Sequence, residues 1–235
     1  MTRTNLARLG GLAAAFGGLL AVAINMLNFV LILSTGRPLE SFARGPLFVL
    51  LELLGVAIAL FLATGLTGLY ALLGRRSRPG ISGLVLAYLS VLASLSFIVF
   101  AIVYVSYQLL TDTDGRIRNS WIVFPENAVD LTGALLLGGG TLLLGAVTFK
   151  DRALGRWSVL PLILGFLYLT LSMLPALVSY LGWTGAPFVL FLGPLAILRA
   201  ACWILLGGVL WAYASRKEAE DARSTPAMMH EGGSA

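Results

Sequence analysis

The 235-residue chain contains few charged residues: Asp, Glu, Lys and Arg together make up 11% of it, whereas hydrophobic residues make up 58%. Charged residues account for about a quarter of an ordinary soluble domain. So few charges cannot cover a surface that faces water. The composition therefore excludes a soluble globular protein and is typical of an integral membrane protein.

Cysteine and histidine are almost absent, with one residue of each, Cys202 and His230. A single cysteine excludes an internal disulfide and a cysteine-based metal site within one chain. Because His230 lies in the polar C-terminal segment, the apolar runs offer no histidine for metal binding or acid–base chemistry. The chain also lacks a Gly-x-Ser-x-Gly elbow and a phosphate-binding loop. We therefore expect no enzyme activity, no metal site and no cofactor.

What the chain does have is six apolar runs, each long enough to cross a bilayer as a helix. The runs are continuously apolar, without the alternation of a membrane β-barrel, so we predict an all-α bundle of six transmembrane helices. The predicted spans are residues 9–34, 46–73, 81–110, 129–149, 157–181 and 187–215, within one transmembrane domain of residues 1–215. Residues 216–235 are polar and rich in small side chains, which predicts a disordered cytoplasmic tail.

The basic residues are distributed unequally between the two sides of this predicted bundle. Eleven lie on the side of the termini and four on the other. The first group is Arg3, Arg8, Arg75, Arg76, Arg78, Lys150, Arg152, Arg156, Arg216, Lys217 and Arg223, and the second is Arg37, Arg44, Arg116 and Arg118. Because cytoplasmic loops carry the excess of Lys and Arg, we predict that both termini are cytoplasmic. The net charge of +5 thus indicates membrane orientation and no nucleic-acid partner.

One charged residue, Arg199, lies within the last predicted span. A charge at that depth costs about 2.5–3.5 kcal/mol on insertion scales, so it needs a partner or a wet cavity. Glu52, in the second span, is the comparable acidic group. Asn25 and Asn28 are three residues apart in the first span and so share a helix face. We predict that these four residues form a polar cluster in the outer half of the bundle, in which Glu52 neutralises Arg199.

Three interpretations of this cluster stay open. It is a buried strut that fixes helix register, a water-filled pocket open to the outside, or no cluster at all, with Arg199 on backbone carbonyls or lipid phosphate. The leading functional prediction is a non-enzymatic protein that binds a small ligand or a membrane-protein partner there. The alternative is a small secondary transporter or channel that uses the same residues. A transporter should continue its polar residues to the cytoplasmic side, and in this sequence they fade.

Small residues predict where the helices pack closely, because they let backbones approach each other in lipid. The candidates are Gly10, Gly11, Gly17 and Gly18 in the first span, the row Gly55, Ala59, Ala63, Thr67 and Ala71 in the second, and Gly138, Gly139 and Gly140 in the fourth.

Two short stretches carry a resemblance. The turn Gly155-Arg156-Trp157-Ser158-Val159 and the last-span stretch Arg199-Ala200-Ala201-Cys202-Trp203-Ile204-Leu205-Leu206-Gly207-Gly208, with the six-span layout and the length, resemble a family of uncharacterised bacterial six-helix membrane proteins of unknown function. The resemblance implies a multi-pass protein of the bacterial plasma membrane. It implies no activity, cofactor or site residue, and the lipid bilayer is the one partner that it supports.

Overall fold

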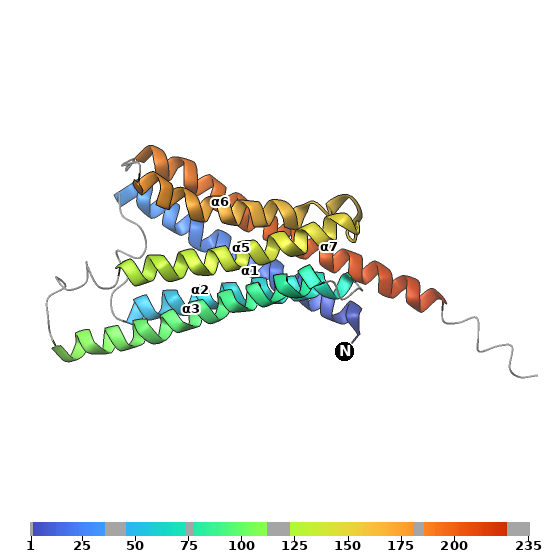
Figure 1. Cartoon of the computed structure of the whole chain (residues 1–235), viewed down its shortest axis with the longest axis horizontal. Coiled ribbons are helices and arrows are strands. Elements are labelled where there is room, and N and C mark those ends of the chain that lie inside the picture. The colour runs from blue at the N-terminus through green and yellow to red at the C-terminus, as the bar shows by residue number, and fades with distance from the viewer. Residues whose placement is uncertain (1, 36–45, 74–77, 112–122, 181–185, 225–235) are drawn as a thin grey trace, which may run out of the picture.

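The computed structural model describes residues 2–35, 46–73, 78–111, 123–180 and 186–224, in parts of some helices by the backbone alone. Within these ranges the chain is helical and contains no strand. The elements are α1 (Arg3–Thr35), α2 (Pro46–Leu72), α3 (Arg78–Thr111), α5 (Val123–Lys150), the short 3-10 helix η2 (Gly155–Trp157), α6 (Leu160–Tyr180) and α7 (Ala186–Ser224) (Figure 1).

Six of the helices in the described part of the chain are long and apolar enough to cross a membrane. The shortest, α6, has 21 residues, and a rise of 1.5 Å per residue makes it about 31 Å long, close to the hydrocarbon thickness of a bilayer. Large apolar side chains point away from the bundle, among them Leu12, Val99 and Phe166, which are 55%, 63% and 64% exposed. A water-soluble bundle would present polar residues there. The prediction of an all-α chain with six helices able to span a membrane is confirmed.

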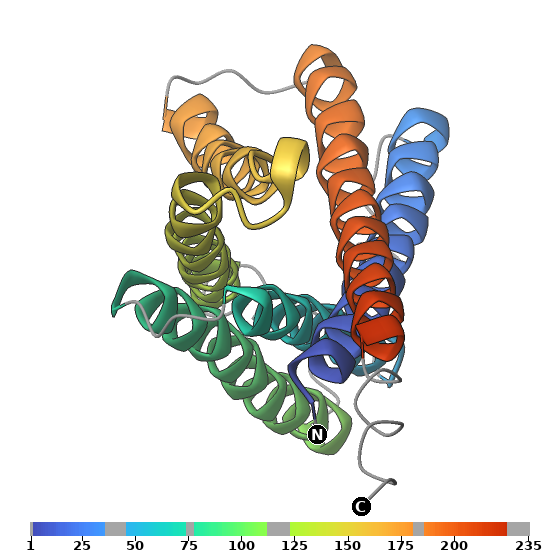
Figure 2. The same cartoon turned by 90° about the vertical axis from the view of Figure 1, so that its right-hand side faces the viewer.

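Both ends of the described chain lie at the same end of the bundle (Figure 1). The start of α1, the connection between α5 and α6 and the end of α7 gather there, whereas α2, α5 and α7 begin at the opposite end. The helices therefore run alternately in the two directions. Each helix packs against the next one in chain order, and α7 returns to pack against α1. Figure 2 shows this arrangement along the bundle, where α6 and α7, which touch least among these neighbours, stand apart.

Helix α1 is held between α2 and α7 by adjacent glycines that face different neighbours. A methyl group on Gly10 would lie 2.5 Å from the Cα of Gly68 in α2, and one on Gly11 would lie 2.8 Å from the carbonyl oxygen of Gly207 in α7. The glycines at positions 17 and 18 repeat the arrangement seven residues later, against α2 and α7 respectively. Neighbouring helix positions point about 100° apart, so each pair serves two interfaces. The predicted close contact at these four glycines is confirmed.

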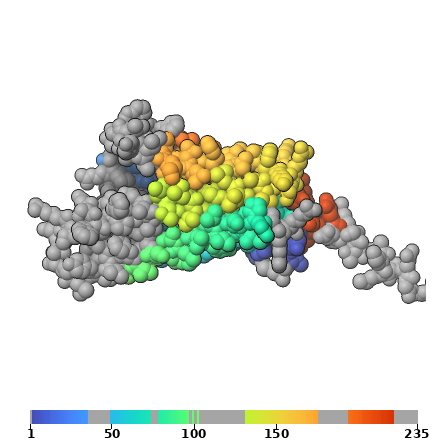
Figure 3. Space-filling model, viewed as in Figure 1, coloured from blue at the N-terminus to red at the C-terminus, as the bar shows by residue number. Residues whose placement is uncertain are grey.

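Helix α5 lies between α3 and α6 on the face shown in Figure 3. A methyl group on Gly140 would lie 2.5 Å from the carbonyl oxygen of Gly83 in α3, and one on Gly145 would lie 2.6 Å from the backbone nitrogen of Leu162 in α6. Backbone contact on two sides confirms close packing in this glycine-rich part of α5. Side chains as large as leucine then fill the interior, as at Leu144, which is fully buried.

The predicted small-residue face of α2 is wrong at its N-terminal end. Gly55 is exposed, and a methyl group there would have no atom within 4 Å. The contacts of α2 with α1 instead use Gly65 and Gly68. A row with strict four-residue spacing drifts by about 40° per step around the helix, so it leaves the interface within a few turns.

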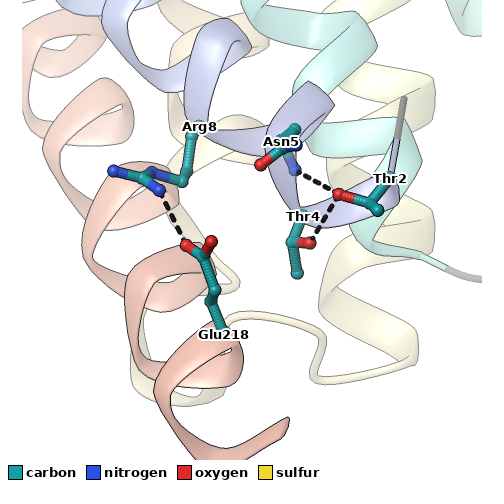
Figure 4. Close-up of polar contacts among 5 residues, drawn as sticks. All are labelled: Thr2, Thr4, Asn5, Arg8 and Glu218. Carbon is teal, nitrogen blue, oxygen red and sulfur yellow. Dashed lines mark hydrogen bonds and ion pairs between the residues drawn. The ribbon is translucent and has the colours of Figure 1, made fainter. Parts of the chain in front are cut away.

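The predicted disordered tail is also wrong in its first part, because α7 continues to Ser224. Residues 216–224 include Glu218, Ala219, Glu220 and Ala222, which favour helix, and extending an existing helix avoids the cost of nucleation. A guanidinium nitrogen of Arg8 lies 2.7 Å from a carboxylate oxygen of Glu218 and ties this extension to α1 (Figure 4). Residues 225–235 of the predicted tail lie outside the described residues.

Several helices begin earlier than the predicted spans, whereas α2 begins at the predicted Pro46 and α6 begins at Leu160, three residues later than predicted. Helix α1 begins at Arg3, six residues before the predicted span, and Thr2 caps it: its hydroxyl oxygen accepts the backbone N–H of Asn5 at 3.3 Å (Figure 4). Helix α5 begins at Val123, with Pro125 in its first turn, where a missing N–H costs nothing. Hydropathy misses such starts because capping residues are polar.

Candidate functional site

Arg199 of α7 lies with its guanidinium over the ring of Tyr168 of α6. The distance from the Arg199 Cζ to the ring centroid is 4.4 Å, inside the range of about 6 Å within which a cation is attracted to an aromatic face. Tyr168 is 8% exposed and Arg199 is half-buried. The aromatic face therefore offsets part of the cost of holding this half-buried cation within an apolar helix.

The position of Tyr168 follows from a glycine on the neighbouring helix. A methyl group on Gly138 of α5 would lie 3.0 Å from the Cβ of Tyr168. The missing side chain thus lets α6 approach α5 at this level and brings the tyrosine ring deep into the bundle. Within α6, Ser172 donates its hydroxyl hydrogen to the Tyr168 carbonyl oxygen at 2.6 Å. Packing against α5 fixes the Tyr168 ring, and Arg199 contacts the face of that ring.

Trp203 lies one turn after Arg199 on the same face of α7. Its ring meets Tyr168 edge-on, with the centroids 6.2 Å apart and the planes at 81°. Trp203 is fully buried, and its indole N–H has no hydrogen-bond partner in the described part of the structure. A buried donor without a partner costs about 1–3 kcal/mol. We call Arg199, Tyr168 and Trp203 the Arg199 cluster.

The Arg199 cluster consists of hydrogen-bond donors. A guanidinium has only N–H donors, an indole has one, and a phenol can donate as well as accept. Within the described residues, no carboxylate lies within 4 Å of the Arg199 guanidinium. The chemistry that completes such a set is an acceptor, and the strongest is an ionised carboxylate or phosphate oxygen.

The predicted ion pair between Arg199 and Glu52 needs correction, because the structure places the guanidinium against Tyr168 instead. Glu52 lies half-buried on α2 and takes part in a polar interaction of its own. The predicted four-residue cluster therefore does not gather around Arg199.

Helix register explains this separation. Helices α1 and α2 are antiparallel, and Gly10 contacts Gly68. This register puts Glu52 level with about residue 26 of α1. The contacts of Gly11 with Gly207 and of Gly18 with Ile204 put the arginine level with about residues 19–23. The two charges are thus offset by roughly 5–10 Å along the bundle, and α1 lies between their helices.

The two asparagines, Asn25 and Asn28, face different helices. Asn25 continues the seven-residue stripe of Gly11 and Gly18, which faces α7, and its amide donates to the carbonyl oxygen of Ala21 at 2.7 Å. Asn28 continues the stripe of Ala14, which faces α2. The same register puts Asn28 level with the turn of α2 that carries Glu52. Asn28 also takes part in a polar interaction. The α1–α2 interface and the Arg199 cluster are two separate polar regions.

Sequence reasoning missed Tyr168 as the partner of Arg199 because it looked for opposite charge. The usable signal was a tyrosine and a glycine, Gly138, in facing helices, together with the i, i+4 spacing of Arg199 and Trp203. Elsewhere in the described ranges, no three His, Cys, Asp or Glu residues gather closely enough to hold a metal ion.

No protein-family model matches the chain, and no curated protein and no solved structure is similar to it. The resemblance to uncharacterised bacterial six-helix proteins therefore stays a prediction.

Proposed function

We propose that the chain is a six-span protein of the bacterial plasma membrane with both termini in the cytoplasm. The six long apolar helices and their lipid-like outer surface support insertion in a bilayer. The bundle end that holds both described chain ends also carries Arg8, Lys150, Arg152 and Arg156. The positive-inside rule favours the cytoplasm for that end.

Within this frame we propose that the protein binds a small amphiphile with an acidic headgroup, without catalysing a reaction. The observation that carries the proposal is the Arg199 cluster: a half-buried guanidinium with an aromatic partner and, one turn away, a buried N–H without an acceptor in the described structure. A carboxylate or phosphate group beside the guanidinium would give it a charged hydrogen-bond acceptor. The ligand then supplies the countercharge that the sequence assigned to Glu52.

The surroundings favour an amphiphile over a water-soluble anion. Arg199 belongs to a helix that spans the bilayer, and its neighbours Leu198 and Leu205 are 51% and 52% exposed on the apolar outer surface. Helices α6 and α7 touch less than the other neighbouring helices. A ligand with an alkyl chain can enter between them from the lipid and place its headgroup at the guanidinium.

The same structure weakens the alternative of a transporter or channel that uses Arg199. Toward the cytoplasmic end, the interior below the cluster is filled by fully buried apolar side chains, including Leu66, Leu69, Leu206 and Leu210. The buried hydroxyl of Thr148 donates to the carbonyl oxygen of Leu144 in its own helix. Transport would need a polar path on this side, so these contacts support binding.

The test is a thermal-shift measurement on the purified chain in nanodiscs with three probes of equal chain length: an alkyl carboxylate, an alkyl phosphate and the uncharged alkyl alcohol. We expect the two acids to raise the melting temperature by several degrees and the alcohol to do so much less. In Arg199→Gln the difference between acids and alcohol should vanish, and in Arg199→Lys part of it should remain. Arg8→Gln is the matched control at the bundle end. Equal shifts by acid and alcohol, or acid shifts that persist in Arg199→Gln, would contradict the proposal.

A further inference from the structure

A second basic site lies at the predicted cytoplasmic end, in the connection between α5 and α6. The residues of this connection line an open cavity of about 660 Å³ at the surface. Its lining combines three cations with apolar and small residues: Lys150, Arg152 and Arg156 with Phe149, Gly155, Ser158 and Val159. This cavity shares no residue with the Arg199 cluster.

The connection has a defined backbone that presents these cations. Arg152 has φ +48° and Gly155 has φ +57°, so the chain turns twice through the left-handed region. Ser158 holds the turn closed from within: it is buried, and its hydroxyl oxygen accepts the backbone N–H of Leu154 at 3.0 Å. The backbone N–H of Ser158 in turn donates to the carbonyl oxygen of Gly155 at 3.2 Å. The cations thus project from a hydrogen-bonded turn.

The apolar part of the lining indicates what kind of anion fits. Phe149 is 56% exposed and Val159 is 38% exposed, at the ends of helices whose outer surface is apolar. Next to them, the guanidinium of Arg156 lies 5.4 Å from the ring centroid of Trp157, which is itself partly exposed. Tryptophan at a helix end is typical of the headgroup layer of a bilayer. Cations on one side and apolar side chains on the other match a headgroup with its attached acyl chain.

We propose that this cavity binds the phosphate headgroup of an anionic phospholipid from the cytoplasmic leaflet. Basic pockets between spanning helices on that side are suited to anionic headgroups. The phosphate oxygens accept hydrogen bonds from Lys150, Arg152 and Arg156, while the glycerol and acyl chains lie along Phe149 and Val159. Asp151, exposed in the same turn, does not line the cavity.

The experiment measures binding of phosphatidylglycerol against phosphatidylcholine to the full chain by native mass spectrometry and by thermal shift. Each cation near an anionic surface contributes about a five-fold change in affinity. The variant Lys150→Gln/Arg152→Gln/Arg156→Gln should therefore lose at least ten-fold in preference for the anionic lipid. The control Arg78→Gln/Arg216→Gln/Lys217→Gln removes equal charge from the same bundle end, from residues that do not line the cavity, and should retain the preference. An equal loss in both variants would show that overall charge attracts the lipid and would overturn the proposal.

A single-site pair keeps the test independent of the folding of the triple variant. Gly155 lines the cavity, and a side chain there would meet no atom within 4 Å at its Cβ. Asn and Asp both tolerate its positive φ better than other residues. Gly155→Asp adds a negative charge to the cavity and should abolish the preference for phosphatidylglycerol, whereas Gly155→Asn should keep it. The same result for both substitutions would overturn the proposal.

The source of the phosphate is decided with soluble probes. Inorganic phosphate and glycerol phosphate at millimolar concentration should leave the melting temperature unchanged, because they lack the acyl chains. Protection by either of them equal to that by the lipid would replace the phospholipid with a free phosphate ligand and so overturn the proposal as stated.

Discussion

Arg199 and Tyr168 join the two neighbouring helices of the bundle that touch least, with the guanidinium carbon 4.4 Å from the ring centroid. This contact connects α6, which packs mainly against α5, with α7, which packs mainly against α1. Arg199 therefore contributes to helix packing in addition to carrying a charge. Its structural role and its proposed role in ligand binding are separable by experiment.

The structural role predicts energetic coupling between these two residues. In a double-mutant cycle of Arg199→Gln and Tyr168→Leu, followed by unfolding in detergent, we expect a coupling free energy of about 0.5–2 kcal/mol. Tyr168→Phe keeps the aromatic face and should retain most of it. The effects of Arg199→Ala and Glu52→Ala should add within about 0.5 kcal/mol. Strong coupling in that second cycle would restore the ion pair predicted from the sequence.

The contact of α1 with α7 predicts opposite effects for two adjacent glycines. A methyl group on Gly207 would lie 2.5 Å from the backbone nitrogen of Ala15, whereas one on Gly208 meets nothing within 4 Å. Gly207→Ala should lower the melting temperature markedly, because α1 and α7 must separate. Gly208→Ala should be neutral or stabilise by up to about 1 kcal/mol through helix propensity. If both variants melt alike, backbone contact between the helices is not what holds them.

A hydroxyl pair between α2 and α3 predicts a small, specific loss. Thr67 donates to the carbonyl oxygen of Ala63 at 3.0 Å and accepts from the Tyr88 hydroxyl at 2.8 Å. Tyr88→Phe should therefore lower the unfolding free energy by about 0.6 kcal/mol, the average for such bonds in a membrane protein. Tyr213→Phe, at an exposed tyrosine of α7, is the control. No further loss should follow when Tyr88→Phe is added to Thr67→Val.

The ion pair of Arg8 with Glu218 predicts a charge-swap effect that depends on salt. Both side chains are largely exposed, so the pair contributes about 0.2–1 kcal/mol. Arg8→Glu and Glu218→Arg should each destabilise the protein by up to about that amount, and the double swap should recover the loss. Salt near 1 M, where the Debye length is about 3 Å, should erase the differences. A double swap that is no better than the single variants would count against the pair.

The proposed orientation predicts which engineered cysteines are accessible from outside. The native Cys202 is buried and is first removed as Cys202→Ala. In that background, Thr35→Cys should react with an impermeant maleimide on intact cells, because α1 ends at that residue on the side away from the termini. Lys217→Cys should react only after lysis. The reverse pattern would invert the topology.

Sequence alone was sufficient for the helices and for much of their packing. Continuous apolar runs leave helices as the option in lipid, and glycine pairs such as Gly10 and Gly11 mark close contact wherever they occur at seven-residue spacing. The row beginning at Gly55 failed because its spacing does not follow the interface around the helix. Residues 216–224 were wrongly predicted to be disordered. Their composition is polar, but they extend α7, and extending an existing helix avoids the cost of nucleation.

The candidate site was harder to predict, because it depends on register between helices that are distant in sequence. Composition offered Glu52 as the natural partner of Arg199, and both residues were placed in the outer half. The side of α1 that each one occupies and their offset along the bundle come from contacts such as Gly10 with Gly68. An aromatic face can also stabilise a cation, so opposite charge alone does not identify the partner of a buried arginine.

The glycine contact between α1 and α7 has a consequence for how the protein is made. Gly11 and Gly207 are almost 200 residues apart in the chain, and a ribosome adds about 5–20 residues per second. About 10–40 s therefore pass between synthesis of the two halves of this interface. Through that interval the stripe of α1 that faces α7 lacks its partner helix. The bundle is complete only after α7, the last helix, has been made. In a chain that stops before α7, the face of α1 that contains Gly11 stays uncovered.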